Sequence, residues 1–590
     1  MPLLGVHAPN GCGVSYCGQA FSVVALEDAA DWYLLRQTSA LAAIGSAWLA
    51  MTSPARSYDV VVIGGGHNGL TCAAYLGMAG LRVKIFERRG IVGGAAVTEE
   101  FYPGFRNSIA AYTVSLLHPK IIADLDLFQH GLKIVERRAQ NFLPTLHGDY
   151  LLIGEGDAKN QVARFGRADG ERYEAFTRQL DASADLLREL ALQTPPNLRR
   201  GWSIGTAGQI LKAGRLGNRL RRLSTENLRT LFELFTKSAG DYLDGWFEGD
   251  LVKALFGFDA IVGNYASPYT PGTAYVLLHH AFGEVNGKKR VWGHAIGGMG
   301  AITQAMARAA AGYGVEIETG AAVRGVLVEN GRACGLELED GRAVRAGAVA
   351  ANIDPKLLYT AMIPHGALDA GFLRRMRAWR CGSGTFRINV ALSKLPSFTA
   401  LPGRDLAPHH SAGIILGPSL THMDRAYCDA RLFGWSREPI IEMVIPSTLD
   451  HTLAPRGAHV ASLFCQHVAP QLPDGSWDHH RERVADLMIE TVDRYAPGFK
   501  ASLIGRQALS PLDLERTFGL SGGDIFHGAL SLDQLFWARP ALGYADYRGP
   551  LKGLYHCGSG AHPGGGVTGV PGHNAARVIV ADRRWRRWLG

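Results

Sequence analysis

The chain has 590 residues and a mass of 63.6 kDa, which is too long for one ordinary domain. Hydrophobic residues make up 47% of it, which excludes wholesale disorder, and a net charge of +8 over this length does not favour nucleic acid as a partner. Glycine accounts for 73 residues, well above the usual ~7%, so we expect many tight turns and close backbone approaches.

The cysteines and the apolar segments exclude further classes of protein. The eight cysteines are scattered and none forms a C-x-x-C pair, so we predict neither a zinc knuckle nor a dithiol redox pair, and no metal site. Scattered thiols in a large chain are typical of a reducing compartment. Residues 39–51 come closest to a membrane span, but they are fewer than the ~18 apolar residues that a bilayer requires.

Residues 1–50 differ in character from the rest of the chain. Arg36 is their only basic residue, whereas a secretory signal begins with positive charge and a transit peptide is rich in arginine. Three alternatives are a disordered extension, a short packed helix around residues 24–50, and a start codon placed too far upstream. We favour the last, with translation beginning at Met51, and assign residues 1–56 to an extension outside the fold.

A strand, a glycine-rich turn and a helix follow in order. The apolar run 58–63 predicts a buried parallel strand, and the next residues, GGGHNG, fit the pattern G-x-G-x-x-G. Gly64 permits the tight turn, Gly66 lets the backbone approach a pyrophosphate, and Gly69 lets the helix lie close to the strand. The N-terminus of that helix offers unpaired N–H groups to a phosphate. The pattern predicts a dinucleotide-binding site.

The next segment indicates which dinucleotide is bound. A second predicted strand, residues 81–86, ends at Glu87, whose carboxylate can accept the ribose hydroxyls and disfavours a 2′-phosphate. NADP is therefore not expected, while NAD and FAD both remain. Gly93 and Gly94 form a second glycine pair directly after this strand, which NAD does not require and which suits a chain passing close to an extended FAD.

A second strand–loop–helix unit lies near the C-terminus. Residues 553–556 predict a short strand, and residues 574–581 predict a helix after a glycine-rich loop. The loop residues expected to face the anionic edge of a flavin are Gly558, Ser559, Gly566 and Val567. His562 is the polar side chain inside this loop. It is our candidate catalytic residue, with support of the loop as the alternative.

The glycine-rich segments carry a family resemblance. Residues 64–100 and 553–576 resemble phytoene-desaturase-like FAD oxidoreductases, and among these they look most like pyridine nucleotide-disulfide oxidoreductase domain-containing protein 2 and its bacterial relatives. Residues 297–355 match as well, with hairpin signals at Asn330-Gly331 and Asp340-Gly341. The resemblance implies FAD as the cofactor, with the backbone of Val323 beside its adenine. Two departures are Ala95-Ala96 in place of an arginine and Ser559 in place of an acid.

The resemblance also implies an α/β fold in which an FAD-binding Rossmann-type domain, glutathione-reductase-like or amine-oxidase-like, carries an inserted α+β substrate domain. We assign residues 57–107, 286–359 and 516–590 to the FAD domain, and residues 108–285 and 360–515 to the substrate domain. Helices are expected within 171–256, and strands at 385–392, 439–445 and 458–464. Aromatic residues of the first insertion are expected to form core rather than to line a channel: Tyr242, Trp246, Phe247, Phe256, Phe258 and Tyr265.

A basic segment, residues 210–229, has its basic residues at helical spacing, with leucines between them. Such a helix can rest on anionic lipid, but a solvated face with the leucines packed inward is the interpretation we favour. At most a weak peripheral contact with a membrane is expected.

The sequence therefore predicts an FAD-dependent oxidoreductase that passes hydride from an apolar small-molecule substrate to the flavin. The chain has no second strand–G-x-G-x-x-G–helix unit, so oxygen or a quinone is expected as a diffusible acceptor. A carotenoid or polyprenyl desaturase or isomerase is one alternative, and an FAD-containing regulatory or assembly protein is another. If the source is bacterial, we expect the cytoplasm; the eukaryotic relatives that it resembles are mitochondrial matrix proteins. No oligomeric state is predicted.

Overall fold

A mixed sheet carries the first glycine motif. In the computed structural model, β1 (Tyr58–Ile63) pairs in parallel with β2 (Val83–Phe86) on one side and with β14 (Ala343–Ala351) on the other. The remaining strands are β11 (Glu316–Glu318), β12 (Val323–Glu329), β13 (Arg332–Leu338) and β20 (Leu554–His556). Their order is β11-β2-β1-β14-β13-β12, with β20 paired to β14. The central valines of β1 are fully buried, as the apolar run predicts.

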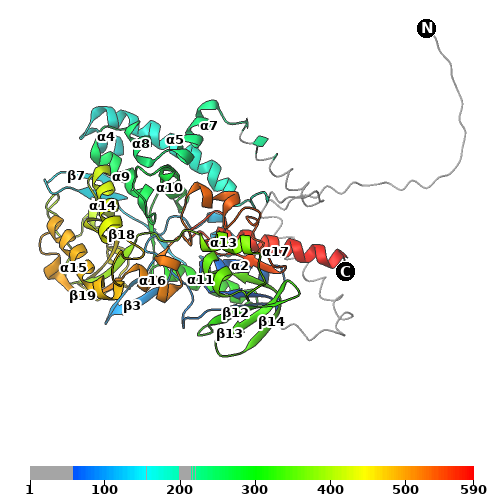
Figure 1. Ribbon diagram of the computed structural model, residues 1–590. Helices are drawn as coiled ribbons and strands as arrows, with labels where there is room; N and C mark the ends of the chain where they lie inside the picture. Colours follow the sequence, from blue (N-terminus) through cyan, green and yellow to red (C-terminus); the bar gives the residue numbers. More distant parts are fainter. Residues whose placement is uncertain (1–57, 155, 198–213, 215–216, 219–220, 590) are drawn as a thin grey trace, which may run out of the picture. The chain divides into compact units, whose positions relative to one another are not determined.

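Three helices pack around this sheet and around one another (Figure 1). α2 (His67–Met78) contacts both α11 (Gly300–Gly312) and α17 (Val570–Leu589). A Cβ atom at Gly572 would lie 2.1 Å from the carbonyl oxygen of Asn68, so the close approach of α17 to α2 requires glycine there. α2 begins at His67, within the first glycine-rich turn, and α17 begins at Val570, before the predicted 574–581, directly after its glycine-rich loop.

A second sheet is built from segments far apart in the chain, in the order β19-β15-β18-β17-β16-β6-β7. Its strands are β6 (Asn141–Pro144), β7 (Tyr150–Ile153), β15 (Phe386–Leu392), β16 (Gly413–Leu416), β17 (Trp435–Val444), β18 (His459–Val468) and β19 (Leu503–Leu509). α15 (Trp477–Tyr495) packs on one face, where Met488 and Val492 join the strand side chains. The three predicted strands of the second insertion are thus confirmed, with small shifts at their ends.

Helices cover the other face of the second sheet, and their aromatic residues form its core. These helices are α4 (Ala158–Ala163), α5 (Arg167–Ala191), α7 (Thr225–Thr236), α8 (Ala239–Asp244), α9 (Asp250–Ile261), α10 (Thr273–His280) and α14 (Leu420–Phe433). Phe176 is ringed by Tyr242, Trp246, Phe247 and Phe256, at centroid distances of 4.6–6.0 Å. The preference for core over a channel is confirmed for these four aromatic residues, since none of them lines the main cavity.

Two connections cross the segment boundaries predicted from the sequence. The hairpin β3 (Thr98–Tyr102) and β4 (Phe105–Ser108) was assigned to the dinucleotide domain, yet it contacts β18 and β19 of the second sheet. β10 (Gly293–Ala295) pairs with β5 (Ile134–Glu136). These short contacts connect segments that were assigned to different domains. A local sequence pattern does not reveal them, because the contacting segments are distant in the chain.

The structure describes residues 58–154, 156–197, 214, 217–218 and 221–589. The extension 1–56 and residues 210–213, 215–216 and 219–220 of the basic segment lie outside the described residues, so the expectations for the extension and for this segment are not tested here. α7 begins at Thr225, at the end of that segment, after its N-cap Ser224. Within the described part of the chain, no helix combines the length and the hydropathy that crossing a membrane requires.

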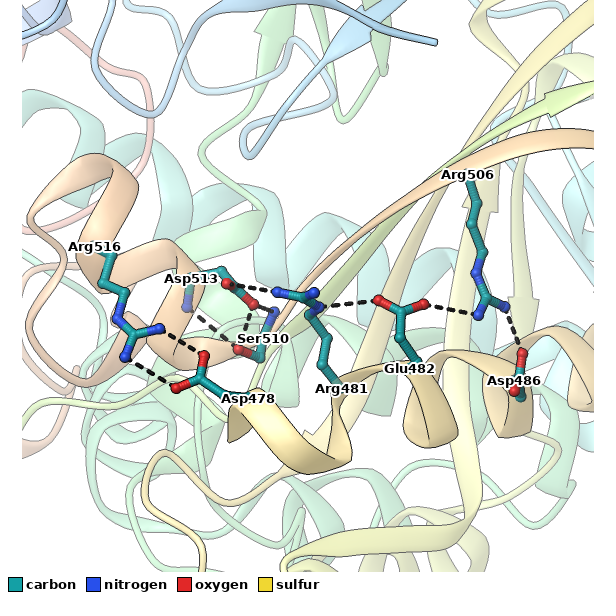
Figure 2. A network of polar contacts seen from close by, with 8 residues as sticks. All are labelled: Asp478, Arg481, Glu482, Asp486, Arg506, Ser510, Asp513 and Arg516. Atoms are coloured by element: carbon teal, nitrogen blue, oxygen red, sulfur yellow. Dashed lines mark hydrogen bonds and ion pairs between the residues drawn. The ribbon is translucent and has the colours of Figure 1, made fainter. Parts of the chain in front are cut away.

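A network of ion pairs fastens α15 to β19 and to α16 (Pro511–Phe518), as Figure 2 shows. Arg506 lies 2.6 Å from Asp486 and 2.8 Å from Glu482, and Arg481 lies 3.1 Å from Asp513. Ser510, the N-cap of α16, forms a capping box with Asp513: its N–H donates to the Asp513 carboxylate, and its hydroxyl oxygen accepts the Asp513 N–H. Arg516 extends the network by pairing with Asp478 at 2.6 Å.

Arg506→Ala should destabilise the protein only slightly, by at most about 1 kcal/mol, because the pairs are partly exposed and screened by salt. The measurement is the midpoint of thermal unfolding at low and high salt, with the loss smaller at high salt. Arg167→Ala, which removes one exposed pair with Glu171 on α5, is the matched control and should change less. A loss of the same size at both salt concentrations would contradict the electrostatic explanation.

Candidate functional site

The first glycine motif forms a tight turn that opens the N-terminus of α2. Gly64 has φ +89° and donates its N–H to the Phe86 carbonyl at 2.9 Å. A Cβ atom at Gly69 would lie 2.2 Å from the Gly64 carbonyl oxygen, and one at Gly66 would lie 2.9 Å from the Asn352 amide nitrogen. Gly64 and Gly66 line the main cavity, whereas Gly69 packs behind them. At Gly64 and Gly66 the backbone of this turn therefore faces the cavity without an intervening side chain.

The second glycine pair lies directly beside the first motif. Gly93 donates its N–H to the Gly65 carbonyl at 2.9 Å and forms a parallel bridge with Gly66. Both Gly93, at φ +132°, and Gly94, at φ +55°, adopt left-handed backbone conformations. A Cβ atom at Gly94 would lie 3.3 Å from the Gly66 Cα atom. Both residues line the same cavity. Two stretches of backbone without side chains therefore face one cavity.

Glu87 lies at the end of β2 and is 6% exposed. One of its carboxylate oxygens accepts the Gly65 N–H at 2.8 Å, and the other accepts the Arg89 N–H at 2.9 Å. A carboxylate oxygen has a second lone pair, so both oxygens can still accept hydroxyl groups from a ligand. Glu87 lines the cavity, and so does Val323 at the start of β12. Glu87 and Val323, the residues expected beside a ribose and an adenine, thus line the same cavity.

The C-terminal loop meets the first motif across almost the whole length of the chain. The Asn68 amide donates to the Ser559 hydroxyl at 3.1 Å, and His67 Nε2 lies 3.1 Å from the Gly566 carbonyl oxygen. Ser559, Gly566 and Val567 line the cavity. Gly558 lies behind them, where a Cβ atom would be 3.2 Å from the Asn352 side chain. The two glycine-rich loops thus form opposite parts of one site.

Arg539 holds this loop in place, and no sequence motif indicated it. Its side chain is fully buried, with the guanidinium donating to the carbonyl oxygens of Ser559 at 2.9 Å, Phe526 at 2.7 Å and Gln534 at 3.1 Å. It also reaches the carbonyls of Gly528 and Ala529, each at 3.3 Å. Burial lowers the pKa of Arg539 to about 10, so it remains charged at neutral pH. Because Ser559 and Phe526 both line the cavity, Arg539 positions two of its walls.

His562, the predicted catalytic residue, does not line the cavity. Its Nε2 atom lies 3.2 Å from the Leu190 carbonyl oxygen, and its ring packs edge-on against Phe536 at a centroid distance of 5.2 Å. Burial lowers the pKa of His562 to about 4, so the ring is neutral at pH 7. The structure therefore does not place His562 in the lining of this cavity, and its contacts fit the alternative of loop support.

His562→Ala should lower the midpoint of thermal unfolding while leaving dinucleotide occupancy and turnover close to wild type. The reason is that the ring contacts the C-terminal end of α5 and Phe536 rather than the cavity. The measurement compares unfolding, bound cofactor and the rate of cofactor reduction in the variant and the wild type. A large fall in the reduction rate at unchanged stability would restore the catalytic role.

Two buried thiols lie close together beside the glycine-rich loops, although the sequence contains no C-x-x-C pair. Cys72 lies on α2 and Cys557 directly precedes the C-terminal loop; both are free and fully buried. Burial and the neighbouring Cys72 thiol raise the pKa of Cys557 well above its usual value. The Cys557 thiol is therefore protonated at neutral pH, the unreactive form of a thiol. Spacing did not reveal the pair because the fold, not the local sequence, brings the two residues together.

The cavity continues past the two loops and ends at a wall of aromatic and acidic side chains. Its volume is about 490 Å³. The residues of this far wall come from the helices, from the second sheet and, for Tyr112 and Trp292, from loops: Tyr112, Asn141, Phe258, Asp259, His280, Trp292, Glu442 and Phe464. The Tyr112 hydroxyl donates to Glu442, whose other oxygen lies 3.9 Å from Arg137. Of the aromatic residues predicted as core, Phe258 is the one that also reaches the cavity.

Central parallel strands, a glycine turn at a helix N-terminus and a second glycine-rich loop define a Rossmann-like dinucleotide-binding protein. A protein-family profile described as "NAD(P)-binding Rossmann-like domain" matches residues 62–125. The chain is 43% identical to pyridine nucleotide-disulfide oxidoreductase domain-containing protein 2 of Rattus norvegicus, over 89% of this chain and 94% of the relative. The chain belongs to that family of oxidoreductases, as its motifs predicted.

More distant relatives agree with this fold. The chain is 24% identical to a lycopene-forming phytoene desaturase of Pseudescherichia vulneris, over 86% of this chain and 96% of the relative. A solved structure of putrescine oxidase with putrescine bound superposes with a TM-score of 0.54 at 16% identity, covering 90% of this chain and 99% of that one. The predicted α/β fold class is thereby confirmed.

Proposed function

We propose that the dinucleotide is FAD and that the protein is an FAD-dependent oxidoreductase acting on an organic substrate in the same cavity. The observation that carries the proposal is the convergence of three glycine-rich stretches, around Gly66, Gly93 and Gly566, on one cavity. The first stretch and Glu87 fit either NAD or FAD. The stretches around Gly93 and Gly566 line the cavity in addition to the first turn and Glu87. A glycine-rich lining of this length fits FAD, which is the longer cofactor.

In this proposal, individual residues of the chain have specific roles in binding the cofactor and the substrate. The bare turn at Gly64 and Gly66 and the N-terminus of α2 bind the pyrophosphate, Glu87 accepts the ribose hydroxyls, and Ser559 with Gly566 contacts the ring system. When bound, FAD supplies a ring that accepts hydride from a substrate carbon. The far wall orients the substrate, and the surrounding buried side chains exclude water from it. Oxygen or a quinone remains our proposed acceptor.

The alternatives fit this cavity less well. A carotenoid or polyprenyl desaturase or isomerase requires a long apolar channel, whereas the far wall carries Asp259 and Glu442. An FAD-containing regulatory or assembly protein requires no substrate space beyond the cofactor. We therefore favour a compact substrate with an apolar skeleton and a polar end, a modification of the apolar substrate expected from the sequence.

The test is anaerobic mixing of the FAD-loaded protein with a library of metabolites, monitored by bleaching of the visible flavin band. We expect compounds of one chemical class to reduce the flavin, and the reduced protein to recover its band with oxygen or a quinone. Failure of every substrate to reduce a fully loaded protein would favour the regulatory alternative.

Glu87→Ala should weaken FAD binding by roughly tenfold or more, because charge-assisted hydrogen bonds to the ribose are lost. The fold should persist, since the two N–H groups that Glu87 accepts belong to two loops that the Gly93–Gly65 hydrogen bond also joins. Titration of the cofactor-free protein with FAD, followed by fluorescence, measures the dissociation constant. Glu99→Ala, which removes a partly exposed partner of Arg89 near the same loop, is the control and should leave it close to wild type. An unchanged constant in Glu87→Ala would show that the ribose lies elsewhere.

A further inference from the structure

We propose that the far end of the cavity binds the carboxylate group of an organic acid, beside Asp259 and Asn141 and in the field of the buried guanidinium of Arg387. Asp259 lies on α9 and Asn141 at the start of β6, and both line the cavity. The inference rests on the proposed function only in identifying this acid with the substrate. Binding of the acid itself is a separate property of the far wall.

Two buried arginines lie directly behind this wall. The guanidinium of Arg387 lies over the Tyr112 ring at 4.4 Å and over the Phe464 ring at 5.6 Å. That of Arg137 lies over the Trp292 ring at 5.8 Å. All three rings line the cavity, whereas the arginines themselves do not. Nε and Nη1 of Arg387 and Nη1 of Arg137 are buried and have no hydrogen-bond partner among the described residues.

The charge of the two arginines exceeds the negative charge beside them. In the described part of the chain, Glu442 is the carboxylate whose charge acts on both guanidinium groups, and burial raises its pKa above the usual value. Tyr112 and Cys465 also lie near them, but burial raises the pKa of both groups and keeps them protonated. Burial lowers the pKa of the arginines, yet a guanidinium stays protonated in proteins. At least one buried positive charge is therefore uncompensated, which is costly unless an anion lies near it.

Asp259 adds little negative charge to this wall at neutral pH. Burial and, to a smaller extent, the charge of Glu442 raise the pKa of Asp259 to about 8. Its neighbour His280 on α10 is neutral, because burial lowers the pKa of that ring to about 4. The protonated carboxyl group of Asp259 can therefore donate a hydrogen bond to a ligand oxygen, and the Asn141 amide offers a second donor at the same wall.

These features favour a carboxylate over other polar groups. An ammonium group would be repelled by the uncompensated guanidinium charge, and an alcohol would gain little from it. A phosphate carries nearly two negative charges and requires more donors than Asp259 and Asn141 supply. Four aromatic rings line the same end of the cavity and can pack against an apolar skeleton. The chemistry therefore selects a carboxylic acid with an aromatic or aliphatic skeleton.

The first test titrates benzoate and hexanoate, with their matched alcohols and amines, into the wild-type protein at neutral pH, with and without FAD. Thermal shift reports binding in both forms, and perturbation of the visible flavin spectrum reports it in the loaded form. We expect each carboxylate to bind roughly tenfold or more tightly than its alcohol, and each amine to bind worst. Equal binding of the three classes, or tighter binding of the amines, would overturn the inference.

The second test removes the uncompensated charge. Arg387→Met should abolish the preference for carboxylates, whereas Arg387→Lys, which keeps a positive charge at this position, should retain part of it. FAD content and thermal unfolding show whether each variant is folded. A preference for carboxylates unchanged in a folded Arg387→Met protein would overturn the inference.

The third test uses pH and does not depend on the folding of the Arg387 variants. Asp259 donates a hydrogen bond while it is protonated, and its ionised form repels a carboxylate. Affinity of the wild type for benzoate should therefore be constant around neutral pH and fall by roughly tenfold per pH unit above about pH 8. In Asp259→Asn the side-chain amide donates at every pH, so this fall should disappear. A fall of the same size in Asp259→Asn would overturn the inference.

Asp250→Asn is the matched control, because Asp250 lies on the same helix, is exposed and does not line the cavity. It should retain the pH dependence of the wild type. Carboxylate binding with these properties by a protein that takes up no FAD would contradict the proposed function and leave the inference standing.

Discussion

Gly66→Val is expected to abolish FAD binding. A Cβ atom at this position would lie 2.9 Å from the Asn352 side chain, which itself donates to the Gly64 carbonyl at 3.2 Å. The two further methyl groups of valine would enter the space that the pyrophosphate needs at the N-terminus of α2. Because Gly66 also forms the bridge to Gly93, the substitution disturbs both bare stretches of backbone at once.

The measurement for Gly66→Val is the FAD content of the purified protein and its titration with added FAD. Gly90→Ala is the matched control, because a Cβ atom there would meet nothing within 4 Å. The control should bind FAD like the wild type. It therefore separates a general effect of replacing a glycine from a specific effect on the glycine-rich turn at Gly64 and Gly66. A Gly66→Val protein that purifies with its full complement of FAD would show that the cofactor lies elsewhere.

Arg539→Ala is expected to lower the free energy of unfolding by about 3 kcal/mol or more, since it leaves several buried carbonyl groups without a donor. Its guanidinium joins the segment 526–534 to the Ser559 carbonyl, so FAD affinity should fall as well. Arg539→Lys should recover only part of the loss, because an ammonium has three N–H donors and lacks the planar fork.

Denaturant unfolding and FAD titration are measured on the same Arg539 variants. Arg380→Ala provides the comparison, because this neighbouring arginine is exposed and pairs with Asp533 at the surface. It should change stability far less. A stability of Arg539→Ala equal to that of Arg380→Ala would mean that the C-terminal loop does not depend on the buried guanidinium.

The parts of the site that depend on local sequence could be predicted. Gly64, Gly66 and Gly69 follow an apolar strand at fixed spacing, and each backbone requirement there arises from neighbours within a few residues or from the adjacent strand. The position of Glu87 follows from the same unit, because the ends of adjacent parallel strands meet at one edge of a sheet.

The far wall could not be predicted, because its side chains come from separate elements without a shared motif. Tyr112 lies in a loop, Asp259 on a helix and Glu442 on a strand, and only the packing of the second sheet against the helices brings them together. No sequence pattern indicated Arg539, because the carbonyl groups that it binds belong to separate segments of the chain. For His562 the sequence located the loop correctly, but the direction of the ring depends on Leu190 and Phe536, which no local pattern identifies.

The central claim, FAD held between the two glycine-rich loops, is tested most directly by identifying the dinucleotide that the protein binds. The protein is purified, incubated with excess FAD, NAD and NADP together, desalted and denatured, and the released dinucleotide is quantified by mass spectrometry. We predict FAD in an amount equimolar with the wild-type chain and none with Gly66→Val. Release of NAD or NADP in place of FAD, or of no dinucleotide from the wild type, would contradict the claim.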